Sequence, residues 1–278
     1  MTSRWGIDAR EPGRTLLVGC GKIGVRLGEE LVARGGEVVA IRRTANGLPA
    51  GFRTIAADLE RPLAQPLPEV DSVVITLPPS RAESDRGSIY PLALRAIADA
   101  LPSAPSRVVF VSSTRVFEGR PGPVPLTERD EPATTTPGGA ALVEGERLAR
   151  ELLDAVIVRP AGIYGPGRES VVRRVLAGDA MDVTRRTNRI HETDVVRLLD
   201  VLLRAATPPP LVHGVDREPV PLGDVVGFIA AGLGVAPPPA AEPSGGGTVL
   251  DGSLLLELLG ELRYPTYREG YAPLLAAR

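Results

Sequence analysis

Glycines punctuate a short turn near the beginning of the chain. The turn reads Gly19-Cys20-Gly21-Lys22-Ile23-Gly24 and lies between an apolar run, residues 15–18, and an amphipathic stretch, residues 25–34. Between a strand and a helix, the first glycine permits a tight turn, the second lets a diphosphate approach the backbone, and the third packs helix on strand. The N–H groups and the positive dipole end of the helix would hold the phosphates. The spacing therefore predicts a dinucleotide-binding turn, with a plain tight turn as the alternative.

A pair of arginines after the second predicted strand bears on the choice of cofactor. A fold selective for NAD usually carries an acid at this place for the ribose hydroxyls. Here the guanidinium groups of Arg42 and Arg43 match the oxygens of a 2′-phosphate in bidentate geometry. We therefore expect NADP in preference to NAD. The alternative is a solvated strand end in an arginine-rich chain.

The ends of the third and fourth predicted strands supply further candidates for the cofactor site. Asp58, which precedes Leu59, could accept a hydrogen bond from an adenine amine, or it could be an ordinary loop acid. Leu77 and Pro78 begin a turn that continues with Pro79. The prolines remove backbone donors, so this turn would pass stiffly over the cofactor. An ordinary loop is the alternative there.

Short β-branched runs alternate with helical patterns along the first part of the chain. The predicted strands are residues 16–18, 37–41, 53–56, 72–76, 108–111 and 155–158, and the predicted helices include 25–34, 88–101 and 140–153. Such alternation predicts βαβ units with right-handed crossovers, and hence a parallel sheet. Ligands of open α/β sheets bind beyond the carboxyl ends of the strands. We therefore expect the site in the turns that follow these strands.

The chain divides into a tail, a domain and a lobe. Residues 1–13 are polar and unpatterned, which predicts a flexible tail. Residues 14–165 are predicted to form the dinucleotide-binding domain, and residues 166–278 a substrate-binding lobe with segments that return to the sheet at about 186–216. A loop is expected at 120–137, a surface linker at 236–247 and a last helix at 253–262. The predicted fold class is α/β, a Rossmann-type doubly wound parallel sheet with a smaller C-terminal substrate lobe.

Composition and charge exclude several classes of protein. The chain has 278 residues and a net charge of −2, with 24% charged and 43% hydrophobic residues, which gives no reason to expect a nucleic-acid or membrane partner. No apolar run approaches the ~20 residues that span a bilayer, and no signal-peptide pattern opens the chain. Cys20 is the only cysteine, which excludes an internal disulfide and favours a cytoplasmic location; we expect this residue to pack rather than to react. With one cysteine and two distant histidines, no metal site is expected.

Several segments taken together resemble the short-chain dehydrogenase/reductase superfamily, in its extended branch of NAD-dependent epimerases/dehydratases. Besides the glycine turn, they are residues 111–117 (VSSTRVF), 158–168 (VRPAGIYGPGR), 188–194, 213–219 and 262–271 (LRYPTYREGY). The last is similar to the C-terminal signature of an atypical subgroup whose cofactor turn reads Gly-Cys-Gly. The resemblance implies a Rossmann domain with a small C-terminal lobe inserted around its last strands. It also implies cofactor contacts for Ser112, Pro160 and Ile163.

The proton-transfer pair of this family is missing from the chain. By resemblance, Ser113 would hold a substrate oxygen, and a tyrosine with a lysine four residues later would donate and accept the proton. Lys22 is the only lysine, so no Tyr-x-x-x-Lys exists here. The dehydratase variant of the family has Asp-Glu after the serine or threonine, whereas this chain has Thr114-Arg115. The usual catalytic machinery is therefore absent.

Alignment on either of two glutamates locates the positions of the missing pair. Aligning Glu146 with the acid that usually follows the motif puts Gly138 and Leu142 at the tyrosine and lysine positions. Aligning Glu144 instead puts Thr136 and Ala140 there. Neither alignment supplies a group that could carry the proton. Both glutamates are expected to be solvated, as a lone glutamate on a helix usually is.

Other protic groups must therefore be weighed as catalysts. Ser113 and Thr114 follow the fifth predicted strand, where a hydroxyl could orient a substrate oxygen or merely bond to the strand end. Tyr164, after the sixth strand, could offer a phenol near the nicotinamide or could anchor its loop by packing. His191 titrates near neutrality and could act as an acid or a base, but it precedes a predicted helix N-terminus, where a histidine is often structural.

Arginines gather in the C-terminal part of the chain. Arg168 and Arg189, with further arginines at 173, 174, 185 and 186, could clamp a carboxylate or a phosphate. The expected partner is therefore a small-molecule substrate that could be anionic. The alternative is a solvated face in an arginine-biased sequence.

These observations leave several functions open. The first is an NADP- or NAD-dependent oxidoreductase or epimerase for a small metabolite, with a divergent proton relay built on Ser113 and assisted by Tyr164 or His191. The second is a non-redox cyclase, dehydratase or isomerase that keeps the fold and needs only positioning and one acid or base. The third is a dinucleotide-sensing regulator that performs no chemistry.

A homodimer is also expected from the resemblance, because the family commonly pairs the helices predicted at 88–101 and 140–153. Both stretches carry large apolar residues that a partner could cover: Leu92, Leu94, Ile97, Leu148 and Leu152. The alternative is that these side chains face the sheet of their own chain.

Overall fold

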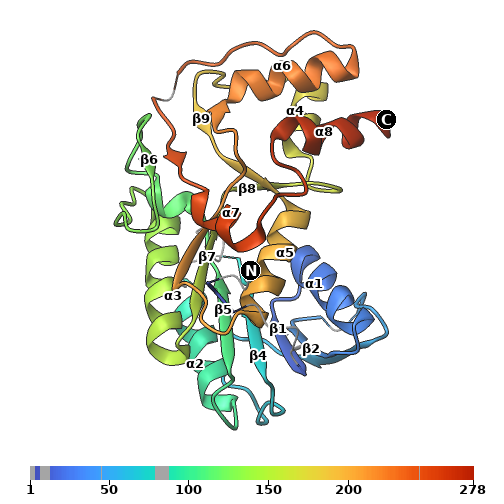
Figure 1. Ribbon diagram of the computed structural model, residues 1–278, viewed down its shortest axis with the longest axis vertical. Helices are drawn as coiled ribbons and strands as arrows, with labels where there is room; N and C mark the ends of the chain where they lie inside the picture. Colours follow the sequence, from blue (N-terminus) through green and yellow to red (C-terminus); the bar gives the residue numbers. More distant parts are fainter. Residues whose placement is uncertain (1–3, 7–12, 45, 79–87, 244) are drawn as a thin grey trace.

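The computed structural model describes residues 4–6, 13–44, 46–78, 88–243 and 245–278, and its centre is a seven-stranded parallel sheet (Figure 1). The strand order is β11-β7-β5-β4-β1-β2-β3. The strands are β1 (Arg14–Val18), β2 (Glu37–Arg42), β3 (Phe52–Ala56), β4 (Ser72–Ile75), β5 (Arg107–Val111), β7 (Val156–Pro160) and β11 (Leu211–Gly214). Non-consecutive neighbours require crossover connections, which confirms the predicted doubly wound α/β fold.

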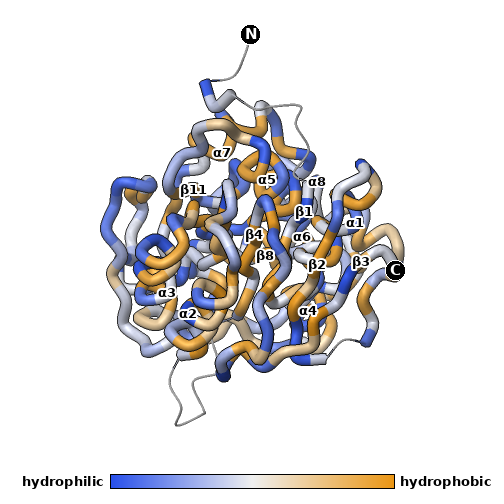
Figure 2. Tube along the Cα trace, turned by 90° about the horizontal axis from the view of Figure 1, so that it is seen from below, coloured by the Kyte–Doolittle hydropathy of each residue, from blue (hydrophilic) through white to orange (hydrophobic). Residues whose placement is uncertain are grey.

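Helices cover both faces of this sheet. The helices α2 (Tyr90–Ala100) and α3 (Pro137–Leu153) lie on one face, and α1 (Lys22–Ala33), α5 (Glu192–Arg204) and α7 (Ser253–Leu259) lie on the other. Successive strand residues alternate between the two hydrophobic cores: Leu16 joins the first and Leu17 the second. Figure 2 shows the hydrophobic colouring gathered along the central strands. Such two-sided burial is why the strands read as continuous apolar runs.

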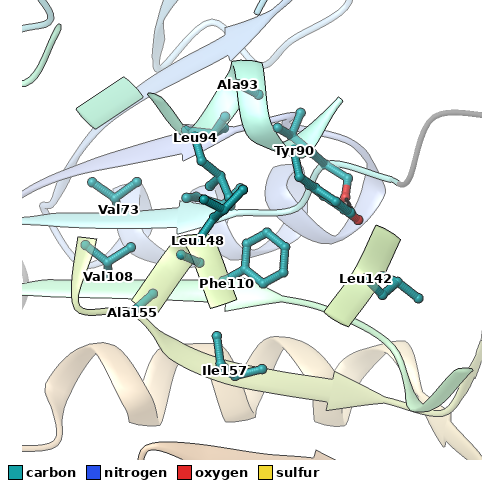
Figure 3. Close-up of a cluster of buried hydrophobic side chains, with 14 of the residues drawn as sticks. Val73, Tyr90, Ala93, Leu94, Val108, Phe110, Leu142, Leu148, Ala155 and Ile157 are labelled. Atoms are coloured by element: carbon teal, nitrogen blue, oxygen red, sulfur yellow. Dashed lines mark hydrogen bonds between the residues drawn. The ribbon is translucent and has the colours of Figure 1, made fainter. Parts of the chain in front are cut away.

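Aromatic packing anchors α2 and α3 to the sheet, as Figure 3 shows. The rings of Tyr90 and Phe110 meet edge to face with centroids 5.3 Å apart, and both side chains are fully buried. Gly145 of α3 lies against Tyr90, since a Cβ at this position would come within 2.7 Å of the Tyr90 ring. A small residue is therefore needed where α3 passes Tyr90.

A smaller lobe stands beyond one end of the sheet (Figure 1). It contains α4 (Ser170–Ala177), α6 (Leu222–Leu233) and α8 (Tyr267–Ala276), which share a third hydrophobic core. Short strand pairs link the lobe to the domain: β8 (Gly162–Tyr164) with β10 (Arg189–His191), β9 (Arg186–Thr187) with β12 (Val220–Pro221), and β6 (Pro125–Leu126) with β13 (Val249–Leu250). The chain returns from the lobe to the sheet at β11, beside β7.

The predicted elements agree with the structure, with shifts at their ends. Helix α1 begins at Lys22 rather than at residue 25, because Gly21 is its N-cap and the helix starts inside the glycine turn. The last predicted helix ends at Leu259, where Gly260 takes a φ of +72°. Strand β6 lies inside the predicted loop and pairs with β13, which follows the predicted linker.

Part of the predicted tail is fixed to the domain. Trp5 packs against the core beneath α1, α5 and α7, and the carbonyl oxygen of Gly6 accepts a hydrogen bond from the N–H of Ala206. Arg4 pairs with Glu257 at 2.7 Å. Residues 4–6 thus differ from the flexible tail that the sequence predicts, because tertiary contacts hold a segment with no periodic pattern.

The apolar residues considered for a dimer interface divide between the interior and the surface. Leu94, Ile97 and Leu148 are buried against the sheet, whereas Leu92 and Leu152 are 53% and 39% exposed. Most of these side chains therefore face their own sheet, and the homodimer stays a prediction. Within the described residues, no helix has the length and apolar character that crossing a bilayer requires.

Candidate cofactor and substrate site

The glycine turn leaves the start of α1 uncovered. Gly19 has a φ of +73°, and a Cβ there would lie 3.2 Å from the Leu77 backbone, so both conformation and space require glycine. Gly21, the N-cap of α1, makes no side-chain cap hydrogen bond, and a Cβ on it would meet only the Gly19 carbonyl oxygen, at 3.7 Å. The first N–H groups of a helix have no intrahelical partner. An anion can therefore approach the backbone at Gly21.

A pocket of about 460 Å³ opens beside this turn. Its lining residues are Cys20, Gly21, Lys22, Val25, Arg26, Arg42, Pro166 and Glu192. The cationic side chains among them outnumber the single carboxylate, so the pocket carries net positive charge. Bare backbone N–H groups, the helix dipole and this charge together fit the diphosphate of a dinucleotide.

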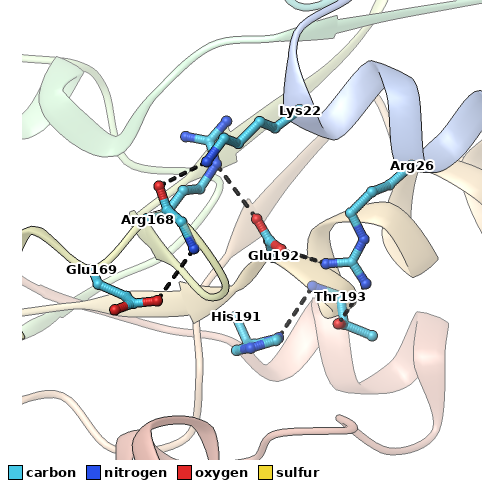
Figure 4. Close-up of polar contacts among 8 residues, drawn as sticks. Lys22, Arg26, Arg168, Glu169, His191, Glu192 and Thr193 are labelled. Atoms are coloured by element: carbon cyan, nitrogen blue, oxygen red, sulfur yellow. Dashed lines mark hydrogen bonds and ion pairs between the residues drawn. The ribbon is translucent and has the colours of Figure 1, made fainter. Parts of the chain in front are cut away.

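Polar contacts join the glycine turn to the loop of residues 165–169, as Figure 4 shows. The Lys22 ammonium donates to the Gly167 carbonyl oxygen at 2.8 Å. The buried Glu192 carboxylate pairs with Arg26 at 2.5 Å and with Arg168 at 3.5 Å. Arg168, predicted to bind substrate, is thus part of the polar network next to the cofactor turn.

Cys20 packs beneath α1 and is 1% exposed. Burial raises the pKa of its thiol to about 11, although Arg42 nearby lowers it. The thiol is therefore protonated and unreactive at neutral pH. This environment agrees with the packing role expected for Cys20.

The other residues predicted on the cofactor side differ in exposure. Arg42 is half-buried at the end of β2 and Arg43 is exposed beside it. The exposed Asp58 accepts from the N–H of Glu60 at 3.1 Å within its own turn. Leu59 and Leu77 are buried in the core, and Pro78 is exposed. Pro79 lies outside the described residues.

Ser112, at the end of β5, is bound in a buried polar cluster. Its hydroxyl donates to Glu146 at 2.7 Å, and the Arg159 guanidinium makes a two-point contact with the same carboxylate at 2.9 and 2.7 Å. Glu146 is 1% exposed, so the expectation that it is solvated is wrong. The Glu144 side chain is 43% exposed and pairs with Arg147. The cluster fixes α3 to β5 and β7, and the Ser112 hydroxyl is occupied within it.

The hydroxyl of Ser113 caps a short 3₁₀ helix, Thr114–Phe117, by accepting from the N–H of Arg115 at 3.2 Å. This is the strand-end hydrogen bonding weighed above as the alternative. A hydroxyl also has one proton to donate, so the bond leaves Ser113 able to orient an oxygen. Thr114 is half-buried in the first turn of the 3₁₀ helix.

Arg115 lies against both positions at which the alignments put the missing tyrosine, and the sequence analysis did not single it out. A Cβ at Gly138 would lie 2.9 Å from Arg115 Nη1. The same guanidinium donates from Nη2 to the Thr136 hydroxyl at 3.0 Å. Gly138 and Thr136 are the tyrosine positions in the two alignments, so both lead to this arginine. Two features of the sequence could have pointed to it. Arg115 stands where the dehydratase variant has an acid, and Gly138 stands at an aligned catalytic position.

His191 and Tyr164 lie on the paired strands β10 and β8, at the interface between the domain and the lobe. His191 caps α5 by accepting from the N–H of Thr193 at 3.2 Å, and burial lowers its pKa to about 4. The Tyr164 hydroxyl donates to the Thr266 carbonyl oxygen at 3.3 Å, its ring stacks on Tyr271 at 4.5 Å, and burial raises its pKa far above the usual range. These contacts match the structural alternatives for both residues.

Arg189 does not reach the candidate substrate site. The side chain is 5% exposed, and its guanidinium bonds to Thr187 and to the Glu218 carbonyl oxygen while lying over the Tyr267 ring. The prediction of substrate binding by Arg189 therefore disagrees with its place in the structure, because the guanidinium is used inside the lobe.

Asp216, beside Arg189, gives a testable pH dependence. Burial raises its pKa from 3.8 to about 7, so the folded state holds this proton more tightly than the unfolded chain. The tighter binding of this proton stabilises the folded state at low pH, and this contribution to the free energy of unfolding is lost as the pH rises from about 4 to about 7. Replacing Asp216 by Asn keeps an acceptor for the N–H of Glu218, which bonds to Asp216 Oδ1 at 3.1 Å, and removes the titration.

In urea unfolding across this pH range, we expect the free energy of unfolding of the wild type to fall relative to Asp216→Asn by about 2–4 kcal/mol. The exposed Asp99 provides the control, because Asp99→Asn should run parallel to the wild type. Parallel curves for Asp216→Asn would contradict the burial of a protonated carboxyl.

The open glycine turn, the crossover sheet and the small lobe define the class of this molecule, a Rossmann-type NAD(P)H-binding protein. A family model described as NAD(P)H-binding matches residues 19–204, and the chain belongs to this family. Among the described residues, no group of histidine, cysteine or acidic side chains is arranged to hold a metal ion.

Particular relatives confirm the resemblance to NAD-dependent epimerases/dehydratases. Protein YeeZ of Escherichia coli (strain K12) is 31% identical over 270 residues, which cover 91% of this chain and 96% of YeeZ. A Methylobacillus flagellatus protein described as a candidate NAD-dependent epimerase/dehydratase is 30% identical, with a TM-score of 0.80 over 96% of this chain and 99% of that one. MoeE5, solved with UDP-glucose and NAD, is 26% identical, with a TM-score of 0.75 over 95% and 98% of the chains.

Proposed function

We propose that this protein is an NADP(H)-dependent oxidoreductase or epimerase of the short-chain dehydrogenase/reductase type, acting on a small metabolite. The observation that carries the proposal is the uncovered N-terminus of α1 at Gly21, inside a pocket lined by Lys22, Arg26 and Arg42. Relatives of similar fold, including MoeE5, are solved with NAD. The bound cofactor would supply the hydride.

The residues of this chain bind and orient under the proposal. The backbone at Gly21 and the Lys22 ammonium would hold the diphosphate, while Arg42 and the exposed Arg43 would hold a 2′-phosphate. Ser113, at the carboxyl end of the sheet, would donate a hydrogen bond from its hydroxyl to a substrate oxygen. The buried cluster of Ser112 with Glu146 holds this strand end against α3.

Cofactor selectivity provides the first test. We expect Arg42→Gln combined with Arg43→Gln to weaken NADPH binding by about tenfold or more, because charge-assisted bonds to the 2′-phosphate are lost. Binding of NADH should change less than about twofold. Arg53→Gln, at an exposed arginine on the neighbouring strand β3, controls for loss of charge. Equal losses for both nucleotides, measured by calorimetric titration, would refute the preference for NADP.

Turnover provides the second test of the proposal. The protein loaded with NADPH is mixed with a panel of small carbonyl compounds, and the protein loaded with NADP⁺ is mixed with a panel of small chiral carbinols. The nicotinamide absorbance and the products are followed together. Oxidation of the cofactor with reduction of a carbonyl supports an oxidoreductase, and inversion of a carbinol centre without net oxidation supports an epimerase. Conversion that proceeds equally well without nucleotide would contradict the proposal and favour the non-redox alternative.

A further inference from the structure

We propose that Arg115, whose guanidinium lies where the resemblance places the catalytic tyrosine of the family, is a substrate-binding residue that takes an anionic oxygen group, a carboxylate above all. The inference rests on the proposed function for the statement that the ligand is the substrate. The site itself stands on the contacts of Arg115 with Gly138, Thr136 and Glu118.

The chemistry of the guanidinium limits what Arg115 can do. An arginine stays charged at any pH that proteins tolerate, so it cannot replace a tyrosine that donates and accepts a proton. Its planar donors instead match the two oxygens of a carboxylate. Replacement of the phenol by this group changes the task at the position from proton transfer to anion recognition.

Neighbouring groups hold the guanidinium in place. Arg115 Nε donates to Glu118 Oε2 at 3.1 Å, and Nη2 donates to the Thr136 hydroxyl at 3.0 Å. Glu118 is itself fixed, because its Oε1 accepts from the N–H groups of Thr135 and Thr136 at 3.1 and 2.7 Å. These hydrogen bonds hold the pKa of Glu118 below its usual value even though burial acts against them. A preoriented arginine loses little side-chain entropy when it binds a ligand.

The whole guanidinium lies against Gly138, since a Cβ there would meet Nη1, Cζ and Nη2 of Arg115 at 2.9, 3.1 and 3.2 Å. The Arg115 side chain is 49% exposed. The absence of a side chain at Gly138 gives the guanidinium its room, and a ligand would reach the guanidinium from its exposed side. Leu142, at the lysine position, is 2% exposed in the core, so no second cation competes from that side. Arg115 follows Ser113 by two residues, and one ligand could therefore contact both.

The test uses calorimetric titration of the full-length protein with malonate, and with neutral malonamide as the matched ligand, in low-chloride buffer. Titrations are run with and without NADPH. We expect malonate to bind and malonamide not to bind. Arg115→Gln should weaken malonate binding by about tenfold or more, because a charge-assisted contact is removed. Arg115→Lys keeps the charge but not the planar donors, so its affinity for malonate should lie between those of the wild type and of Arg115→Gln.

Arg147→Gln is the matched control variant. Arg147 is 50% exposed on α3 and is paired with Glu144 and Glu151, so it resembles Arg115 in exposure and in its carboxylate contacts. It should bind malonate as the wild type does. NADPH affinity should stay within about twofold in every variant, and melting temperatures establish that each is folded. The role of Arg115 is overturned if malonate fails to bind the wild type or binds Arg115→Gln equally well. NADPH binding that survives such a result leaves the proposed function standing, and loss of NADPH binding in the wild type would overturn that function separately.

Discussion

Replacing Gly21 by aspartate is expected to abolish dinucleotide binding while leaving the protein folded. The new carboxylate would stand where the diphosphate approaches, and like charges at short range repel. We expect NADPH affinity to fall by at least about 100-fold, close to 3 kcal/mol. The fold should tolerate the change, because a Cβ at Gly21 meets only one atom, at 3.7 Å, and aspartate is a good N-cap. The free energy of unfolding should change by less than about 0.5 kcal/mol.

The control for this variant is a second glycine with open space. A Cβ at Gly227, in α6, meets no atom within 4 Å. Gly227→Asp adds the same charge far from the turn and should bind NADPH within about twofold of the wild type. Calorimetric titration gives the affinities, and urea unfolding gives the stabilities. NADPH affinity that survives in Gly21→Asp would place the nucleotide elsewhere.

Removing the buried Glu146 carboxylate is expected to destabilise the fold strongly. Arg159 is 3% exposed, so Glu146→Ala would leave a guanidinium buried without its counter-charge and the Ser112 hydroxyl without its acceptor. Breaking a buried pair in this way costs about 3–5 kcal/mol. That is a large part of the 5–15 kcal/mol, roughly, by which a domain is stable. Urea unfolding measures the loss.

The same helix offers a matched control. The Glu144 side chain is 43% exposed and pairs with Arg147 at the surface, and Glu144→Ala should cost less than about 1 kcal/mol. Replacing the buried pair together, as Glu146→Leu with Arg159→Met, should cost less than Glu146→Ala alone, because no unpaired charge remains. Equal effects of Glu146→Ala and Glu144→Ala would show that the buried cluster does not hold α3 to the sheet.

The parts of the molecule that local patterns control could be predicted from the sequence. Strand periodicity and glycine spacing act between near neighbours, so the sheet, its helices and the turn at Gly19 follow from short stretches of chain. Both alignments of the missing proton pair, through Gly138 and Thr136, lead to one place in the fold, beside Arg115.

Burial of polar side chains could not be predicted from short stretches of sequence, because it depends on tertiary packing. Glu146 lies on α3 and its partner Arg159 lies on β7, and only the tertiary structure shows that the two meet. His191 and Tyr164 were weighed as acids or bases from residue type, yet packing between the domain and the lobe decides their pKa values. Arg115 was passed over because its role depends on Gly138, a residue on a different helix that leaves room for the guanidinium.

The central claim is that a dinucleotide binds with its diphosphate at the start of α1. A crystal structure of the protein grown with saturating NADP tests it most directly. We predict diphosphate oxygens within hydrogen-bond distance of the backbone N–H groups that follow Gly21, with Lys22 beside them. Ordered nucleotide in another pocket, with the glycine turn left free, would contradict the account.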